Sequence, residues 1–181
     1  MVWLFPAPVR TAVTAMTGLV DEALRSRFNL AGGLAEESVT LVDPAVGTGT
    51  FMLGALRSIA QTVKADQGAG AVSAAMSSVL NRLIGFEIQL GPFAVAQLRV
   101  LAELASLGVP PGTPPQMFVT DTLANPYVEE EHLGSIYEPI AESRRQANLI
   151  KKDRKVLVVI GNPPWKGKSK GEGGWVETGN P

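Results

Sequence analysis

The chain has 181 residues, of which 45% are hydrophobic and 18% are charged, a composition that predicts one globular domain with a single core. Its formal net charge of −1 excludes a uniformly basic surface for nucleic-acid phosphates, and its lack of cysteine excludes disulfides, Cys-ligated zinc, iron–sulfur clusters and thiol catalysis. No apolar run approaches the roughly 20 residues that span a bilayer, and the N-terminus lacks signal-peptide features, so we expect a soluble cytoplasmic protein without membrane contacts.

The first predicted element is a helix over 11–28. Its apolar side chains recur every three or four positions, at Val13, Met16, Val20, Leu24 and Phe28, which is the spacing of a core-facing helix surface. The β-branched segment 38–42 then predicts a short strand that runs into a glycine-containing turn at 43–50, and helical periodicity follows over 51–64. A strand, a glycine turn and a helix in this order are typical of the start of an α/β sheet.

The middle of the chain predicts a second unit of the same kind. Residues 66–78 are rich in Gly, Ala and Ser, and they fit either a flexible insertion or the loop and start of a second helix that ends near Arg82. A strand is predicted over 83–86, ending on Glu87, and a helix over 95–107, where glycine and proline close it. The repeated strand–helix order favours a parallel sheet.

Two further strands are predicted toward the C-terminus. The third covers 117–120 and ends on Asp121, and the polar segment 129–149 that follows it is expected to be partly helical. The fourth covers 156–160, where a continuous apolar run indicates a parallel strand buried on both faces. Two prolines soon after it cannot continue a strand ladder.

Each predicted strand ends on a distinctive polar group: Asp43, Glu87, Asp121 and Asn162. Ligands of open parallel sheets bind outside the carboxyl ends of the strands, so these groups are expected to meet at one crevice. A carboxylate placed like Glu87 can accept both ribose hydroxyls, and Asp121 can accept an adenine amine. The alternatives are that Glu87 is a helix-start or solvated carboxylate and that Asp121 caps a turn.

The turn after the first strand favours a cationic or zwitterionic cofactor. Gly47 and Gly49 would let backbone approach a ligand closely at a helix N-terminus, whereas Asp43 adds negative charge where a pyrophosphate would lie. No Gly-Lys-Ser/Thr follows this turn, as a P-loop would require, and the third glycine of a dinucleotide fingerprint is absent from it.

The segment after the fourth strand, Asn162-Pro163-Pro164-Trp165, indicates recognition of a planar nitrogen. An amide carbonyl and a rigidly held proline carbonyl can accept both hydrogens of an exocyclic amine or amide nitrogen. The Trp165 ring offers a flat face for a base extruded from a duplex. By itself such a segment could also be a structural turn.

These motifs in this order, DPAVGTGTF, FE, TDTL and GNPPW, resemble the amino-group DNA methyltransferases that make N6-methyladenine. GFEIQLGPFAVAQLRV, FVTDTL and VLVVIGNPPW are most similar to the methylase portion of type ISP restriction-modification and helicase–methylase polypeptides. The resemblance covers residues 5–165. It implies a Rossmann-like S-adenosylmethionine-dependent methyltransferase sheet of which this chain holds the first four strands.

The resemblance also implies a role for each motif. The residues expected around the methionine part of S-adenosylmethionine are Asp43, Pro44, Ala45, Val46, Gly47, Thr48, Gly49 and Thr50, and Phe51 is expected in the same cofactor site. Glu87, with Ile88 beside it in the cofactor site, would hold the ribose, and Asp121 with Thr122 the adenine. Asn162, Pro163, Pro164 and Trp165 would hold the target base, with Trp165 where the family usually has Tyr or Phe. Pro8 follows an alanine where the family usually has a threonine, so a hydroxyl contact to the methionine carboxylate is not expected.

The implied reaction is adenine-specific DNA methylation, which needs neither a metal nor a covalent enzyme intermediate. Its partner would be DNA with a flipped adenine, contacted through regions that the family carries after this segment. We therefore interpret residues 1–165 as the N-terminal part of a catalytic domain and 166–181 as a flexible truncated tail. The fourth strand should lie beside the first with an open apolar edge, leaving the isolated chain inactive and marginally stable. The alternatives are a methyltransferase for protein glutamine or RNA, and a cofactor-binding fragment completed by a partner such as the downstream polypeptide.

Overall fold

The computed structural model describes residues 7–112, 114–127 and 138–163. Its elements in chain order are α1 (Ala7–Phe28), η1 (Gly33–Ala35), β1 (Leu41–Asp43), α2 (Thr50–Gln67), η2 (Ala69–Ala71), α3 (Val72–Val79), β2 (Leu83–Glu87), α4 (Leu90–Ser106), β3 (Gln116–Val119), α5 (Glu138–Asp153) and β4 (Val158–Val159). None of the helices in these ranges has both the length and the apolar character needed to cross a bilayer.

The four strands form one parallel sheet in the order β3-β2-β1-β4. Leu41 of β1 pairs with Leu83 of β2 on one side and with Val158 of β4 on the other. This arrangement confirms the predicted α/β fold with an incomplete Rossmann-like sheet, and it confirms that the fourth strand lies beside the first. Because all strands are parallel, their carboxyl ends share one edge of the sheet.

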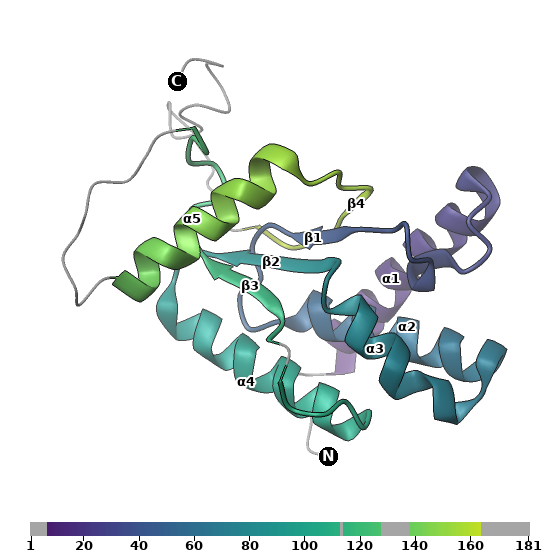
Figure 1. The fold of residues 1–181 in the computed structure, drawn as a ribbon. Coiled ribbons are helices and arrows are strands. Elements are labelled where there is room, and N and C mark those ends of the chain that lie inside the picture. The colour runs from purple at the N-terminus through teal and green to yellow at the C-terminus, as the bar shows by residue number, and fades with distance from the viewer. Residues whose placement is uncertain (1–6, 113, 128–137, 164–181) are drawn as a thin grey trace.

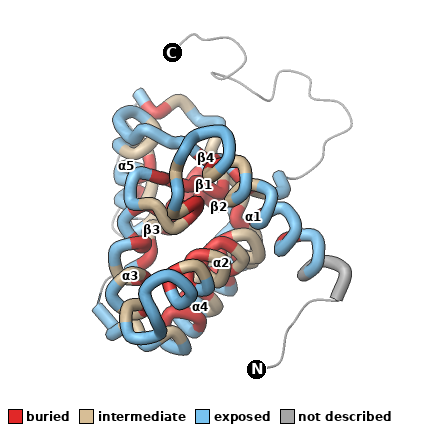
Figure 2. The backbone as a smooth tube through the Cα atoms, turned by 90° about the vertical axis from the view of Figure 1, so that its right-hand side faces the viewer, coloured by how far each residue is buried: buried red, intermediate tan, exposed pale blue. Residues whose placement is uncertain are grey.

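Helices cover both faces of the sheet and form three layers (Figure 1). Helices α1 to α4 pack on one face in the larger core cluster, which includes Leu41, Leu83, Met117 and Val158 from the strands. On the other face, Ala147 of α5 joins a smaller cluster with strand residues such as Ile84 and Phe86. Figure 2 shows the buried residues concentrated between these layers.

Most predicted elements exist, with ends that differ by a few residues. The Gly, Ala and Ser-rich segment 66–78 is helical in η2 and α3, which decides between its two interpretations. Helix α4 begins at Leu90, five residues earlier than predicted. Pro92 is compatible with this start because it lies in the first turn, where no intrahelical N–H bond is lost. Helix α5 confirms that the segment 129–149 is helical in part, and residues 129–137 of that prediction lie outside the described residues.

Two predictions about burial are wrong. On α1, Met16 and Phe28 are 42% and 57% exposed, and Thr17, which bonds the Val13 carbonyl, is buried in their place. In the predicted strand 156–160 only Val158 and Val159 are paired, and Val159 is 67% exposed. Within the described chain, α5 packs against β3 and does not cover this face of β4.

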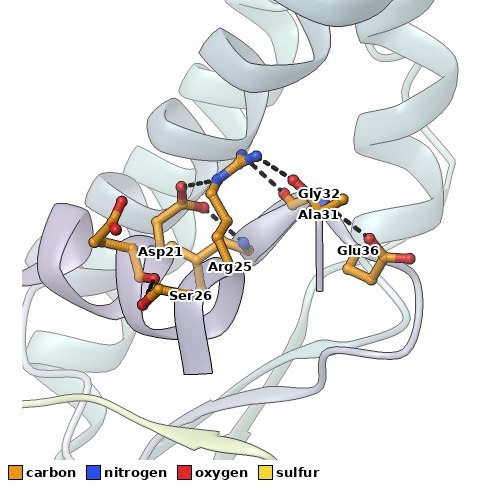
Figure 3. Close-up of polar contacts among 8 residues, drawn as sticks. Asp21, Arg25, Ser26, Ala31, Gly32 and Glu36 are labelled. Atoms are coloured by element: carbon orange, nitrogen blue, oxygen red, sulfur yellow. Dashed lines mark hydrogen bonds and ion pairs between the residues drawn. The ribbon is translucent and has the colours of Figure 1, made fainter. Parts of the chain in front are cut away.

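The connection from α1 to β1, residues 29–40, lies at the amino end of the sheet and is called here the amino-end connection. Arg25 of α1 donates to the carbonyls of Ala31 and Gly32 and to Asp21, 2.7 Å away (Figure 3). Asp21 in turn accepts the Leu34 N–H at 2.7 Å. Ion pairs and backbone bonds therefore fix the connection against α1.

Arg82, which precedes β2, holds the amino-end connection from the opposite side. Its buried guanidinium donates to the carbonyls of Leu34, Ala35 and Val39 at 2.9–3.0 Å. Burial lowers the pKa of Arg82, while the charges of Glu37 and Glu36 act in the opposite direction. One side chain thus satisfies three carbonyls that have no strand or helix partner.

Candidate functional site

The loop that follows β1, residues 44–49, is called here the glycine loop, and it requires glycine at two positions. Gly47 and Gly49 have φ angles of 55° and 82°, in the left-handed region that side chains disfavour. A Cβ on Gly49 would also lie 3.2 Å from the Cβ of Ala96 on α4. The loop therefore reaches the start of α2 with its backbone close to α4.

Bonds from β2 hold the first half of the glycine loop. The Val46 N–H donates to the Phe86 carbonyl at 2.9 Å, and the Gly47 N–H donates to Glu87 Oε2 at 2.8 Å. Glu87 Oε1 accepts the N–H of Gln89 at 2.8 Å, just before α4. Glu87 therefore accepts at the start of α4, as the helix-start alternative predicted, and it also fixes the glycine loop. Each of its two carboxylate oxygens retains acceptor capacity for a ribose hydroxyl.

Asp43, the last residue of β1, is completely buried. Its Oδ1 accepts the Ala45 N–H at 3.1 Å, whereas its buried Oδ2 has no hydrogen-bond partner in the part of the chain that the structure describes. Burial raises the pKa of Asp43 to about 7; the Ala45 bond opposes this rise, and the negative charge of Glu87 adds to it. A cation bound nearby would stabilise the ionised carboxylate.

The end of β4 lies directly against Asp43. A Cβ on Gly161 would be 2.6 Å from Asp43 Oδ1 and 3.1 Å from Pro44 Cδ, so glycine is needed for this close approach. The next two residues, Asn162 and Pro163, are exposed. The structure thus brings the start of the Asn-Pro-Pro motif to the glycine loop, while Pro164 and Trp165 lie outside the described residues.

The loop after β3 also reaches the glycine loop. The Thr122 hydroxyl donates to the Pro44 carbonyl, although β2 separates β3 from β1 in the sheet. Asp121 is exposed, and its Oδ1 accepts the Leu123 N–H at 2.9 Å, as the turn-capping alternative predicted. The carbonyl of Asp121 accepts the Lys151 ammonium of α5 at 2.6 Å.

The other predicted cofactor residues are spread over the same edge and α1. Ile88 is exposed, Val46 is buried, and the half-buried members are Pro44, Ala45, Thr48, Thr50 and Phe51. Pro8 lies in α1, and its side chain is not described. The carboxyl end of the sheet therefore combines backbone from the glycine loop, two buried acids, an exposed apolar side chain and an exposed amide.

Arg99 of α4 contacts the glycine loop and was not among the residues predicted from the sequence. Its guanidinium donates to the carbonyl of Thr48, between the two left-handed glycines, and lies 3.4 Å from the Thr48 hydroxyl. The two residues are 51 positions apart, so no local pattern reveals the contact. The only signal is a charged residue within the otherwise largely apolar sequence of α4.

The fold is shared with parts of three proteins whose structures were solved in complex with DNA or a DNA substrate mimic. A nuclease-deletion mutant of the type ISP restriction-modification enzyme LlaGI, in complex with a DNA substrate mimic, matches with a TM-score of 0.69 and 21% identity over 92% of this chain and 13% of that chain. The ATP-dependent type ISP restriction-modification enzyme LlaBIII, bound to DNA, matches with a TM-score of 0.71 and 23% identity over 94% of this chain and 11% of that chain.

The DrdV–DNA complex matches with a TM-score of 0.66 and 26% identity over 93% of this chain and 15% of that chain. No family model and no curated protein sequence matches the chain. The chain therefore spans between 11% and 15% of the length of these solved structures, and the likeness establishes a common α/β fold.

Proposed function

We propose that the chain is the cofactor-binding part of an S-adenosylmethionine-dependent methyltransferase that modifies the N6 amine of adenine in DNA, within a restriction-modification system. The observation that carries the proposal is the close approach of Gly161 to Asp43 and Pro44. It brings the residue before Asn162 to the start of the glycine loop. The fold shared with LlaGI and LlaBIII, both studied with DNA, supports this substrate class.

The residues present fit a cofactor that carries positive charge. The buried Oδ2 of Asp43 has no partner among the described residues, and Glu87 places a second carboxylate beside the loop. Both features oppose a pyrophosphate and favour a sulfonium or an ammonium group. S-adenosylmethionine, when bound, would supply a methyl group already activated by its sulfonium.

The protein's part in the reaction would be positioning. The Asn162 amide oxygen and the Pro163 carbonyl would accept the two hydrogens of the target amine and direct its lone pair at the methyl group. Alignment of the two reactants and exclusion of water then lower the barrier without a covalent enzyme intermediate. Asn162 is exposed in the chain described here, so it is accessible to a base that has left its duplex.

The first test is a calorimetric titration of the 181-residue chain with S-adenosylmethionine. Binding with a dissociation constant of about micromolar would support the cofactor assignment. A folded chain that does not bind would overturn it.

The second test measures transfer of a labelled methyl group from S-adenosylmethionine to DNA by the 181-residue chain together with the other polypeptides of the restriction-modification system to which it is proposed to belong. Asn162→Ala is expected to lower transfer by about 10²- to 10³-fold while the affinity for S-adenosylmethionine stays unchanged. Asn81→Ala, which alters an exposed amide outside the crevice, is the matched control. Transfer to protein glutamine or RNA in place of adenine would contradict the substrate, and a loss of cofactor affinity in Asn162→Ala would contradict the role of Asn162.

A further inference from the structure

The glycine loop has one internal hydrogen bond, from the Gly49 N–H to the Val46 carbonyl at 2.8 Å, and is otherwise ordered by contacts with neighbouring elements. Two of its six residues are glycines with left-handed φ angles, and glycine loses more backbone freedom on ordering than any other residue. A loop that orders only when a ligand arrives lowers the affinity by the cost of that ordering. Contacts that order the free loop therefore favour binding.

The hydrogen bonds from β2 reach the glycine loop only as far as Gly47. They end at the Gly47 N–H, which bonds Glu87. The next peptide group carries the Thr48 carbonyl, and Arg99 of α4 donates to it. Arg99 thus restrains the loop at the one residue between Gly47 and Gly49.

Helix α4 is itself firmly placed behind the loop. Ala96 is fully buried and lies against Gly49, and Glu103 is an ion-pair partner of Arg57 on α2. Ala96, Arg99 and Glu103 are spaced by three and four positions, so they share one face of the helix. Burial lowers the pKa of Arg99, as does the charge of Arg57, while Glu103 raises it, and a guanidinium remains protonated in proteins.

We propose that Arg99 is a positioning residue of the cofactor site: by holding the Thr48 carbonyl it orders the glycine loop before the cofactor binds. The expected effect of Arg99 on cofactor affinity rests on the proposed function. The ordering of the glycine loop is a property of the free chain and can be measured without the cofactor. Arg99 acts through Thr48 and needs no contact with the cofactor.

The experiment compares amide hydrogen exchange of residues 45–50 in the free chain with the dissociation constant for S-adenosylmethionine. Arg99→Met keeps most of the apolar stem and removes every donor, so both quantities are expected to rise by about tenfold. Arg99→Lys keeps a cationic donor at the end of a differently shaped side chain, so both should lie about threefold above the wild type, between the wild type and Arg99→Met.

The matched control is Arg154→Met. It removes another guanidinium that donates to a backbone carbonyl, that of Asn81, outside the glycine loop, so it should leave exchange in 45–50 and cofactor affinity unchanged. Wild-type exchange and affinity in Arg99→Met, or an equal change in Arg154→Met, would overturn the inference.

The outcomes also separate this inference from the proposed function. If the wild-type chain does not bind S-adenosylmethionine, the proposed function fails, while exchange in the free chain still decides whether Arg99 orders the loop. If Arg99→Met does not fold, Arg99→Lys decides: about threefold faster loop exchange than the wild type supports the inference, and equal exchange overturns it.

Discussion

The glycine loop and the amino-end connection lie at opposite ends of β1 and are held in the same way, by an arginine that donates to backbone carbonyls. Arg82 serves the amino-end connection and Arg99 the glycine loop. Their acids differ. Asp21 at the amino end is paired with Arg25, whereas Oδ2 of Asp43 at the carboxyl end is buried without a partner in the described structure. The first arrangement contributes stability, whereas the second lowers stability and is consistent with the cationic cofactor proposed above.

The largest expected effect concerns the pH dependence of stability. A rise in the pKa of Asp43 from 3.8 to about 7 corresponds to at most about 4 kcal/mol. The folded state holds the proton in this interval and the unfolded state does not, so the unfolding free energy should fall as the pH rises from about 4 to about 7. Chemical denaturation at several pH values measures it.

Asp43→Asn isolates this contribution because it cannot ionise. The unfolding free energy of the wild type minus that of Asp43→Asn should decrease over the same pH interval and then level off. Curves that run parallel from pH 4 to 8 would mean that Asp43 is not perturbed in the folded protein.

Removal of the Arg82 guanidinium should have the next largest effect. Arg82→Met leaves three carbonyls of the amino-end connection without a donor, and we expect a loss of about 3 kcal/mol in unfolding free energy. Arg154→Met, which removes an exposed bond to the Asn81 carbonyl, should cost less than about 1 kcal/mol. Equal losses in the two variants would show that burial of Arg82 adds nothing.

A pair of glycines compares the crowding of the two regions. A Cβ on Gly161 would meet Asp43 Oδ1 at 2.6 Å, and a Cβ on Gly32 would meet Glu36 Oε2 at the same distance. The Glu36 side chain can move, and the Glu36 backbone N, 3.1 Å from the Gly32 Cβ, needs to shift only slightly. The carboxyl of Asp43 is enclosed, so Gly161→Ala should cost about 2 kcal/mol and Gly32→Ala about half as much. Thermal denaturation of both variants tests this order, and the reverse order would contradict it.

A pair of glutamates gives the smallest predicted effect and separates stability from binding. Glu87 accepts the Gly47 N–H in the glycine loop, and Glu36 accepts the Gly32 N–H in the amino-end connection. Glu87→Gln should weaken S-adenosylmethionine binding by about tenfold, or about 1.4 kcal/mol, and Glu36→Gln should not change it. Calorimetric titration distinguishes the two, and equal affinities would remove Glu87 from the site.

The sequence was sufficient for the order of elements and for the edge where the site lies, because these follow from local periodicity and from the rule for parallel sheets. It was not sufficient for the extent of β4. An apolar run indicates burial on both faces, but the exposure of Val159 depends on where α5 packs. The link from Arg99 to Thr48 and the enclosed state of Asp43 also arise from tertiary contacts between segments that are distant in sequence.

The pairing of β4 with β1 has a consequence for the order of folding. Leu41 pairs with Leu83, which lies nearer to it in the sequence, whereas its other partner, Val158, comes after every helix of the described residues in chain order. Closing the longer loop costs more chain entropy, so β4 should dock late. Ile160→Val should then speed unfolding and leave the refolding rate unchanged, whereas slower refolding would place β4 in the nucleus. During folding, the glycine loop would thus be formed before the segment that ends at Asn162 is placed beside it.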